Sequence, residues 1–388
     1  MSGEISSGVR NPALRPPGNP DPIHSGVYRS MDPVEGRGGA NICGPYEPVA
    51  GWPKQAHPGE WKTGSGRGVL VDGDRIVGVY GGEVPAYTTE SVWGVNTFRD
   101  LRFTEVNARF LPEHRHCHEI VMYDHDGNIL EDWDQWLDEL HANDVTAGKK
   151  PKSGHINRLR FNPHDPERHV WLVGLGNNGV FKFTNDGKEL ALKIDARSIP
   201  EAYHPFIYAQ DVAFLPGGDL LVGHLHHLMR FTADGAFVSA IGGQGQQPLQ
   251  FDGIHDIQIH PVTGDIYVND RVNERIQILD PDLRFKELWG GIQGVYSMRI
   301  TADGQHLWTG NGFAQKFLKY DMAGRLIREA TWGTFGIAPG ALWGQHGFDT
   351  DTEGNLYVAE DYSGRIQKLR PLPGTDPSDP QLIGPLAP

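Results

Sequence analysis

The sequence predicts an all-β protein, a six-bladed β-propeller of four-stranded antiparallel blades. One observation is a unit of four short strands that recurs along the chain. Another is the turn chemistry, because Asp-Gly, Asn-Asp-Gly and Gly-Asn pairs separate the strands and are typical of hairpins. A third is the 50 glycines in 388 residues, about twice ordinary usage, which suit many tight turns.

The plainest copy of the repeat covers residues 254–290. Residues 257–259 alternate apolar and polar side chains, 266–268 are apolar, 275–279 alternate again, and 286–289 close the unit. Alternation with a period of two is typical of half-buried strands, and the short turns between the runs favour antiparallel pairing. Residues 254–290 are therefore expected to form a four-stranded meander.

Five further copies complete the predicted ring. Alignment on the second strand finds them at 169–190, 218–238, 305–327 and 354–372, and an irregular first copy at 66–133 carries a long insertion over about residues 82–118. A unit of this size cannot bury both faces alone, so radial packing around a channel is expected. The last copy ends after three strands. We expect residues 46–53 to supply its fourth strand and so to join the first and last blades.

These boundaries predict one propeller domain over residues 46–372. Residues 1–45 and 373–388 are rich in proline and glycine and are interpreted as an irregular N-terminal arm and C-terminal tail. Cys43 and Cys117 are the only cysteines and lack the spacing of a metal or redox motif, so no disulfide framework is expected.

Charge and hydropathy narrow the classes of partner. The net charge is −14 and no Lys/Arg-rich run occurs, which disfavours nucleic acid and anionic membranes. No apolar segment approaches the length of a membrane span, and the first residues lack the apolar region of a signal peptide. We expect a cytoplasmic protein with a small-molecule substrate. The sequence does not predict whether the protein is a monomer or an oligomer.

The candidate site comes from the innermost strands, which begin at the mouth of the channel. They open at Arg67, His155, Gln210-Asp211, His255-Asp256, Tyr296-Ser297 and His346-Gly347. The three histidines fall on alternate blades, 100 and 91 residues apart. A single histidine is more often a structural hydrogen-bonding group, but three at matched positions favour a catalytic metal site with an open coordination position. Zinc or another divalent transition metal is the expected cofactor.

The motifs around these residues resemble the peptidylglycine amidating lyase family, six-bladed propellers of NHL-type repeats that cleave an α-hydroxyglycine amide with zinc. The resemblance rests on RGVLVDGD at 67–74, HDIQIHPVTGDIYVNDR at 255–271 and HGFDTDTEGNLYVAED at 346–361. It implies zinc ligation by His155, His255 and His346, and substrate-facing roles for Arg67 and Arg271. The family's catalytic tyrosine is replaced by His226, and Gly347 stands where the family has a calcium-binding Asp. Calcium is therefore not expected.

The chemistry of these side chains assigns them roles that do not depend on the family. Arg67 and Arg271 can hold a carboxylate or a developing oxyanion. His226 is a candidate general acid or base, with a polar channel lining as the alternative. Candidate substrate contacts are Tyr80, Tyr296 and His224. Candidate carboxylate acceptors that orient the ligand histidines are Asp211, Asp270 and Glu360.

The leading hypothesis is a metal-dependent lyase that acts on a small hydroxylated or carboxylated substrate at the channel mouth. A metal-dependent hydrolase of a lactone or ester is the first alternative, and a non-enzymatic binding module is the second, because propellers host many functions. The cluster His114, His116 and His118 precedes an outer strand and is expected to be structural.

Overall fold

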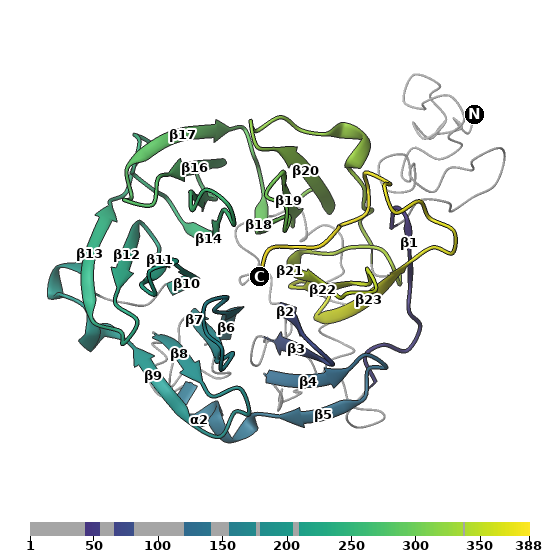
Figure 1. Ribbon diagram of the computed structural model, residues 1–388, viewed down its shortest axis with the longest axis horizontal. Coiled ribbons are helices and arrows are strands. Elements are labelled where there is room, and N and C mark those ends of the chain that lie inside the picture. Colours follow the sequence, from purple (N-terminus) through teal and green to yellow (C-terminus); the bar gives the residue numbers. More distant parts are fainter. Residues whose placement is uncertain are drawn as a thin grey trace, which may run out of the picture.

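The strands form six sheets arranged as a ring around a central channel (Figure 1). A computed structural model describes residues 43–54, 66–80, 120–140, 155–175, 179–204, 209–336 and 338–388, with the side chains of His155 and Leu175 outside the description. The arrangement confirms the six-bladed propeller expected from the repeats.

The first three blades each contain four antiparallel strands. The first consists of β2 (Gly66–Asp72), β3 (Arg75–Tyr80), β4 (Ile120–Asp124) and β5 (Ile129–Asp132). The second consists of β6 (His155–Phe161), β7 (Val170–Leu175), β8 (Gly179–Phe183) and β9 (Leu190–Ile194). The third consists of β10 (Ala209–Phe214), β11 (Leu220–His224), β12 (His227–Phe231) and β13 (Phe237–Gly242).

The last three blades follow the same order. The fourth consists of β14 (Ile254–Ile259), β15 (Ile266–Asp270), β16 (Arg275–Leu279) and β17 (Phe285–Gly290). The fifth has β18 (Val295–Ile300), β19 (His306–Asn311) and β20 (Lys316–Asp321), and isolated bridges at its outer edge join β20 to Leu326 and Trp332. The sixth consists of β21 (Gln345–Thr350), β22 (Leu356–Glu360), β23 (Arg365–Pro371) and β1 (Tyr46–Pro48).

Short helical turns occur only between strands in the described parts of the chain. They are η5 (Asp134–Trp136), α2 (Leu137–Leu140), η6 (Ala196–Ser198), η7 (Glu201–Tyr203) and η8 (Arg328–Ala330). Within the described ranges, no helix has both the length and the apolar character that crossing a bilayer requires.

The ring closes through β1, as the sequence predicts. Tyr46 pairs with Pro371 and Pro48 with Leu369, so a strand from the N-terminal side completes the sixth blade. The strand is shorter than the predicted segment, because the chain turns at Gly51, whose φ is +73°, a conformation that glycine adopts without strain. Trp52 then packs between the first and last blades, with ring centroids 5.6 Å from Tyr123 and 5.1 Å from Tyr357.

Apolar side chains fill the space between neighbouring blades. One cluster joins Trp171 and Val180 of the second blade to Val212 and Val222 of the third. These side chains are at most 1% exposed, and full burial of each aliphatic side chain stabilises the fold by about 1.5–3 kcal/mol. Because both faces of a blade are covered in this way, the innermost strands are held rigidly around the channel.

The C-terminal tail is irregular but ordered against the propeller. Ile383 is 1% exposed, and its N–H donates to the Tyr46 hydroxyl at 2.8 Å. Ala387 N–H donates to the Ile300 carbonyl at 2.7 Å, so the tail extends from the rim to the end of the innermost strand β18. Figure 1 accordingly places the C-terminus near the centre of the ring.

Candidate functional site

Each innermost strand carries a bulge at its channel-mouth end. The pairing of each strand with its neighbour skips one residue, and the skipped residues are Arg67, Asn157, Gln210, His255, Tyr296 and His346. A bulge re-aims a side chain and is frequent beside functional sites. We call these six residues the bulge positions, and the end of the channel where they lie the histidine mouth.

The register corrects one sequence assignment. Asn157, and not His155, occupies the position in the second blade that His255 and His346 occupy in the fourth and sixth. His155 lies two residues earlier, paired with Leu175 at the first position of β6. Side chains two residues apart point to the same face of a strand, so the alternation of the sequence could not distinguish His155 from Asn157. A ligand role for His155 stays a prediction, since its side chain lies outside the described residues.

His255 and His346 form the centre of the histidine mouth. Both are buried, at 3% and 1% exposure, and their ring centroids are 5.1 Å apart at an interplanar angle of 71°. His255 Nδ1 lies 2.9 Å from the Tyr296 carbonyl oxygen, and His346 Nδ1 lies 2.8 Å from the Arg67 carbonyl oxygen. A carbonyl only accepts, so these short contacts place the proton on each Nδ1 and the lone pair on each Nε2. Arg158 Nη2, a donor, lies farther from His255 Nδ1, at 3.4 Å.

The electrostatic environment keeps both imidazoles neutral. Burial lowers the pKa of His255 and of His346 well below the ordinary value, and guanidinium groups nearby lower both further. Among the described residues, neither Nε2 has a hydrogen-bond partner. A neutral imidazole with a fixed Nδ1–H is the form that binds a metal ion or accepts a proton.

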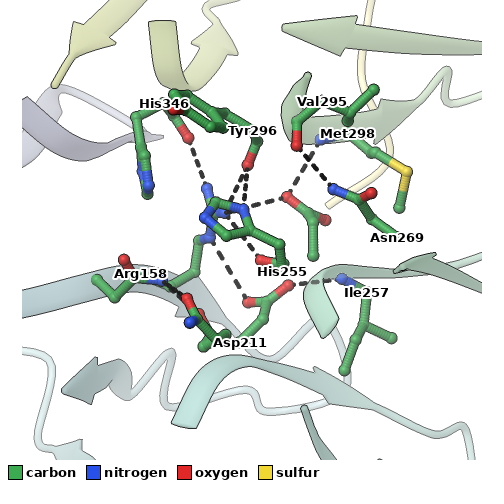
Figure 2. Close-up of polar contacts among 12 residues, drawn as sticks. Arg158, Asp211, His255, Ile257, Asn269, Val295, Tyr296, Met298 and His346 are labelled. Atoms are coloured by element: carbon green, nitrogen blue, oxygen red, sulfur yellow. Dashed lines mark hydrogen bonds and ion pairs between the residues drawn. The ribbon is translucent and has the colours of Figure 1, made fainter. Parts of the chain in front are cut away.

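Arg158 holds the histidine mouth together and was missed at the sequence level. Its guanidinium donates to the carbonyl oxygens of His346 at 2.6 Å, Tyr296 at 2.8 Å and His255 at 3.1 Å (Figure 2). The side chain is 2% exposed. One arginine from the second blade therefore fixes the backbone of the bulge positions in the fourth, fifth and sixth blades.

Two buried carboxylates balance this charge. Asp256 Oδ2 lies 3.5 Å from Arg158 Nη2, and Asp211 Oδ1 lies 4.0 Å from Arg158 Nε. Asp211 also accepts the Ile257 N–H at 2.7 Å, which ties the third blade to the fourth. Among the described residues Asp211 contacts the site through Arg158 and not through His255 or His346, and its role in orienting a ligand histidine stays a prediction. Burial raises the pKa of Asp211.

Asp270 and Glu360 each pair with an arginine of their own blade. Asp270 accepts from Arg275 Nε at 2.7 Å and Glu360 accepts from Arg365 Nε at 2.5 Å. In both blades the acid ends one strand and the arginine begins the next, so the two are direct cross-strand partners. This repeated pair fixes the turn of its own blade, and neither carboxylate has a recorded contact with His255 or His346.

Cationic and aromatic groups border the two histidines. Arg67 Nη2 lies 3.2 Å from Asp361 Oδ1, and Arg271 Cζ lies 5.3 Å from the centre of the Tyr296 ring. The Tyr296 ring packs against His346 at 5.6 Å, and its hydroxyl lies 2.5 Å from the Tyr362 hydroxyl. Burial raises the pKa of Tyr296, so the phenol stays protonated. The mouth therefore combines two neutral imidazoles, two guanidiniums and an aromatic wall.

Two further predicted residues, His226 and His224, do not occupy bulge positions. His226 occupies the turn before β12, with Nδ1 3.5 Å from Asp252 Oδ1. That turn contacts the start of β14, because the Leu225 carbonyl accepts the N–H of Ile254 at 2.8 Å. His224 is 6% exposed on β11, where it pairs with Ala209 and not with a bulge position.

Tyr80 does not line the histidine mouth. It is 1% exposed in an apolar cluster with Ile76, Val121 and Ile366, and its hydroxyl lies 2.9 Å from that of Tyr123. The predicted substrate contact is therefore corrected to a core role. The sequence placed Tyr80 near the channel, whereas its side chain packs in the apolar cluster between the first and last blades.

Metal-ligating side chains do not gather into a cluster within the described ranges. No group of three or more His, Cys, Asp or Glu that could hold a metal ion occurs there. The cluster His114, His116 and His118 and the thiol of Cys117 lie outside those ranges. Cys43 is buried and its Sγ lies 2.9 Å from the Tyr46 carbonyl oxygen, and burial raises its pKa to about 11, so this thiol is structural.

Comparison with known proteins places the chain among propellers without assigning it to a family. No protein-family model matches the sequence. A streptogramin B lyase structure superposes with a TM-score of 0.50 at 12% identity, covering 84% of this chain and 96% of that one. An inactive virginiamycin B lyase from Staphylococcus aureus with quinupristin gives 0.46 at 12% identity, covering 85% and 88%. At these identities the likeness concerns the fold, and the resemblance to NHL-type amidating lyases is not specifically supported.

Proposed function

We propose that the protein is a lyase whose active site is the histidine mouth. The observation that carries the proposal is the pair His255 and His346, two buried neutral imidazoles whose Nδ1 protons are held by carbonyls and whose Nε2 lone pairs remain available. Buried, perturbed histidines at the mouth of a channel are typical of a site that moves protons or binds a metal.

The substrate in this proposal carries an anionic group. Arg67 and Arg271 lie near enough to His346 for their charges to lower its pKa, so both guanidiniums act on the same small space. Arginine binds carboxylates through a planar fork of donors, and a substrate carboxylate would be oriented by the two arginines while a hydroxyl approaches the histidines. Arg67 would share its charge between the substrate and Asp361.

A divalent transition metal, zinc first, is part of the proposal. His255 and His346 would hold it through Nε2, with His155 as the proposed third ligand. Both described histidines fit this role, because a ligand imidazole normally donates its other N–H to a carbonyl or carboxylate. When bound, the metal supplies Lewis acidity that lowers the pKa of a hydroxyl in the site.

The chain's own groups have defined tasks in the elimination. Arg67 and Arg271 bind and orient the anionic end, and they stabilise negative charge that develops as the bond to the leaving group breaks. His226, in the turn beside β14, is the proposed acid or base that exchanges a proton with solvent. Tyr296, held by Tyr362, gives one wall of the site a fixed aromatic face.

The comparison with known structures supports the proposal through the fold alone. A streptogramin B lyase is built on a propeller that overlaps 84% of this chain. That likeness gives an example of lyase chemistry on such a scaffold, whereas the choice of substrate depends on the side chains at the mouth.

A substrate panel tests the proposal. Small hydroxylated carboxylates and hydroxylated amides would be incubated with the protein and followed by proton NMR, because elimination creates a new double bond whereas hydrolysis releases an acid and an alcohol. We expect turnover that is lost in His346→Ala and retained in the surface variant Arg230→Met. Turnover unchanged in a His255→Ala, His346→Ala double variant would exclude the histidine mouth as the active site.

A further inference from the structure

A cavity lies at the opposite end of the channel from His255 and His346. Its volume is about 270 Å³. Its walls come from the ends of the innermost strands and the loops that follow them, including Phe161, Phe214 and Ile259. All six innermost strands begin at the histidine mouth, so their final residues surround the other mouth. None of the bulge positions lines this cavity.

The cavity has apolar walls and several cationic side chains, among them Arg160, Arg168 and Arg299. Leu70, Val212 and Ile257 contribute apolar surface, and Arg160 contributes a guanidinium whose side chain is 14% exposed. Arg160 uses Nη2 alone to reach Asp211 Oδ2 at 2.7 Å and Asp256 Oδ1 at 3.1 Å. Its Nε and Nη1 have no hydrogen-bond acceptor within the described residues, although both are donors.

Further polar side chains line the cavity: His164, Arg168, Gln258, His260, Arg299 and Asp349. Arg168 donates to Asp72 at 2.6 Å. Gln258 donates from Nε2 to Asp256 at 2.9 Å, and its Oε1 has no donor in the part of the chain that the structure describes. Arg299 is held by Asp349 at 3.3 Å and donates to the Ala387 carbonyl at 2.7 Å. Arg160, Arg168 and Arg299 are thus each paired with an aspartate, while Nε and Nη1 of Arg160 keep no acceptor among the described residues.

We propose that this cavity is a binding site for a small monocarboxylic acid with an apolar body. The carboxylate would accept a charge-assisted hydrogen bond from Nε or from Nη1 of Arg160. The apolar body would lie against Phe161, Phe214 and Ile257. The size is adequate, because an apolar cavity of about 150 Å³ already binds benzene. This site is separate from the histidine mouth and does not depend on the proposed lyase activity.

Calorimetry with trans-cinnamate tests the site, with the neutral cinnamamide as the matched probe. The titrations use an Arg67→Met, Arg271→Met background, so that the arginines of the histidine mouth do not contribute. We expect one cinnamate per chain and at least tenfold weaker binding of cinnamamide. Arg160→Gln should weaken cinnamate binding at least tenfold and leave cinnamamide nearly unchanged, because only the charged contact is lost.

A filling variant makes the test independent of the arginine. Ala213 lines the cavity at 6% exposure, so Ala213→Leu should abolish binding of both probes, whereas Ala233→Leu on the exposed turn of the same blade should not. Thermal unfolding confirms that each variant is folded. No cinnamate binding at about millimolar concentration, or equal binding in wild type, Arg160→Gln and Ala213→Leu, would overturn the proposal.

Discussion

Replacement of Arg158 by methionine should destabilise the protein by about 3–5 kcal/mol, the range measured when one partner of a buried ion pair is removed. The guanidinium donates to three carbonyls at 2.6, 2.8 and 3.1 Å and faces two carboxylates with no exposed surface. Three lost hydrogen bonds at about 1 kcal/mol each give the lower end of this range. The rest of the destabilisation comes from the buried carboxylates of Asp211 and Asp256, which would then have Arg160 as their remaining ion-pair partner.

Urea denaturation monitored by tryptophan fluorescence measures this change. Arg230→Met is the matched control, because Arg230 pairs with Asp219 at the surface, with side chains 35% and 24% exposed, and such pairs contribute at most about 1 kcal/mol. A free energy of unfolding for Arg158→Met within 1 kcal/mol of wild type would refute the role of Arg158 as the common anchor of three blades.

Three other predictions follow from the closure, the site and its charge. Deletion of residues 1–53 should prevent soluble folding, because it removes the strand that pairs with β23, while deletion of 1–20 should not; expression and thermal unfolding distinguish these outcomes. Arg271→Met should remove about 2–3 kcal/mol of transition-state stabilisation, measured as a fall in kcat/KM for a carboxylate substrate, and should leave the bound metal in place. A loss of metal that accompanies the loss of activity would show a structural role. The pKa values of His255 and His346 are lowered in the folded protein, so the unfolded chain binds protons more readily. The free energy of unfolding of the metal-free protein should therefore be highest above about pH 6.5 and should decrease as the pH falls below that value. Urea titrations of wild type and a His255→Asn, His346→Asn double variant test this, and equal pH slopes would contradict it.

The sequence predicts the architecture well because the repeat is a local pattern. Alternating strands and Gly-containing turns define each blade, and the apolar segment at 46–53 is readable as a displaced fourth strand. His255 and His346 were also found by position, since each stands two residues into an innermost strand, and the structure brings their rings together.

The remaining parts of the site depend on contacts between blades, which no local pattern encodes. β6 begins two residues before its bulge position, whereas β14 and β21 begin one residue before theirs, so the second blade presents Asn157 where the sequence suggested His155. Arg158 and Arg160 appear in the sequence as alternating cations on a strand. Their carboxylate partners lie about 50 and 100 residues away, and only the closed ring brings them within reach.

The central claim is that the histidine mouth is a metal-dependent active site, and elemental analysis of purified protein tests it most directly. We predict about one divalent transition metal per chain in the wild type, lost in His255→Ala and in His346→Ala and retained in His306→Ala, which changes a partly exposed histidine on β19. Metal near zero in the wild type after gentle purification, or full occupancy in both His255→Ala and His346→Ala, would contradict the claim.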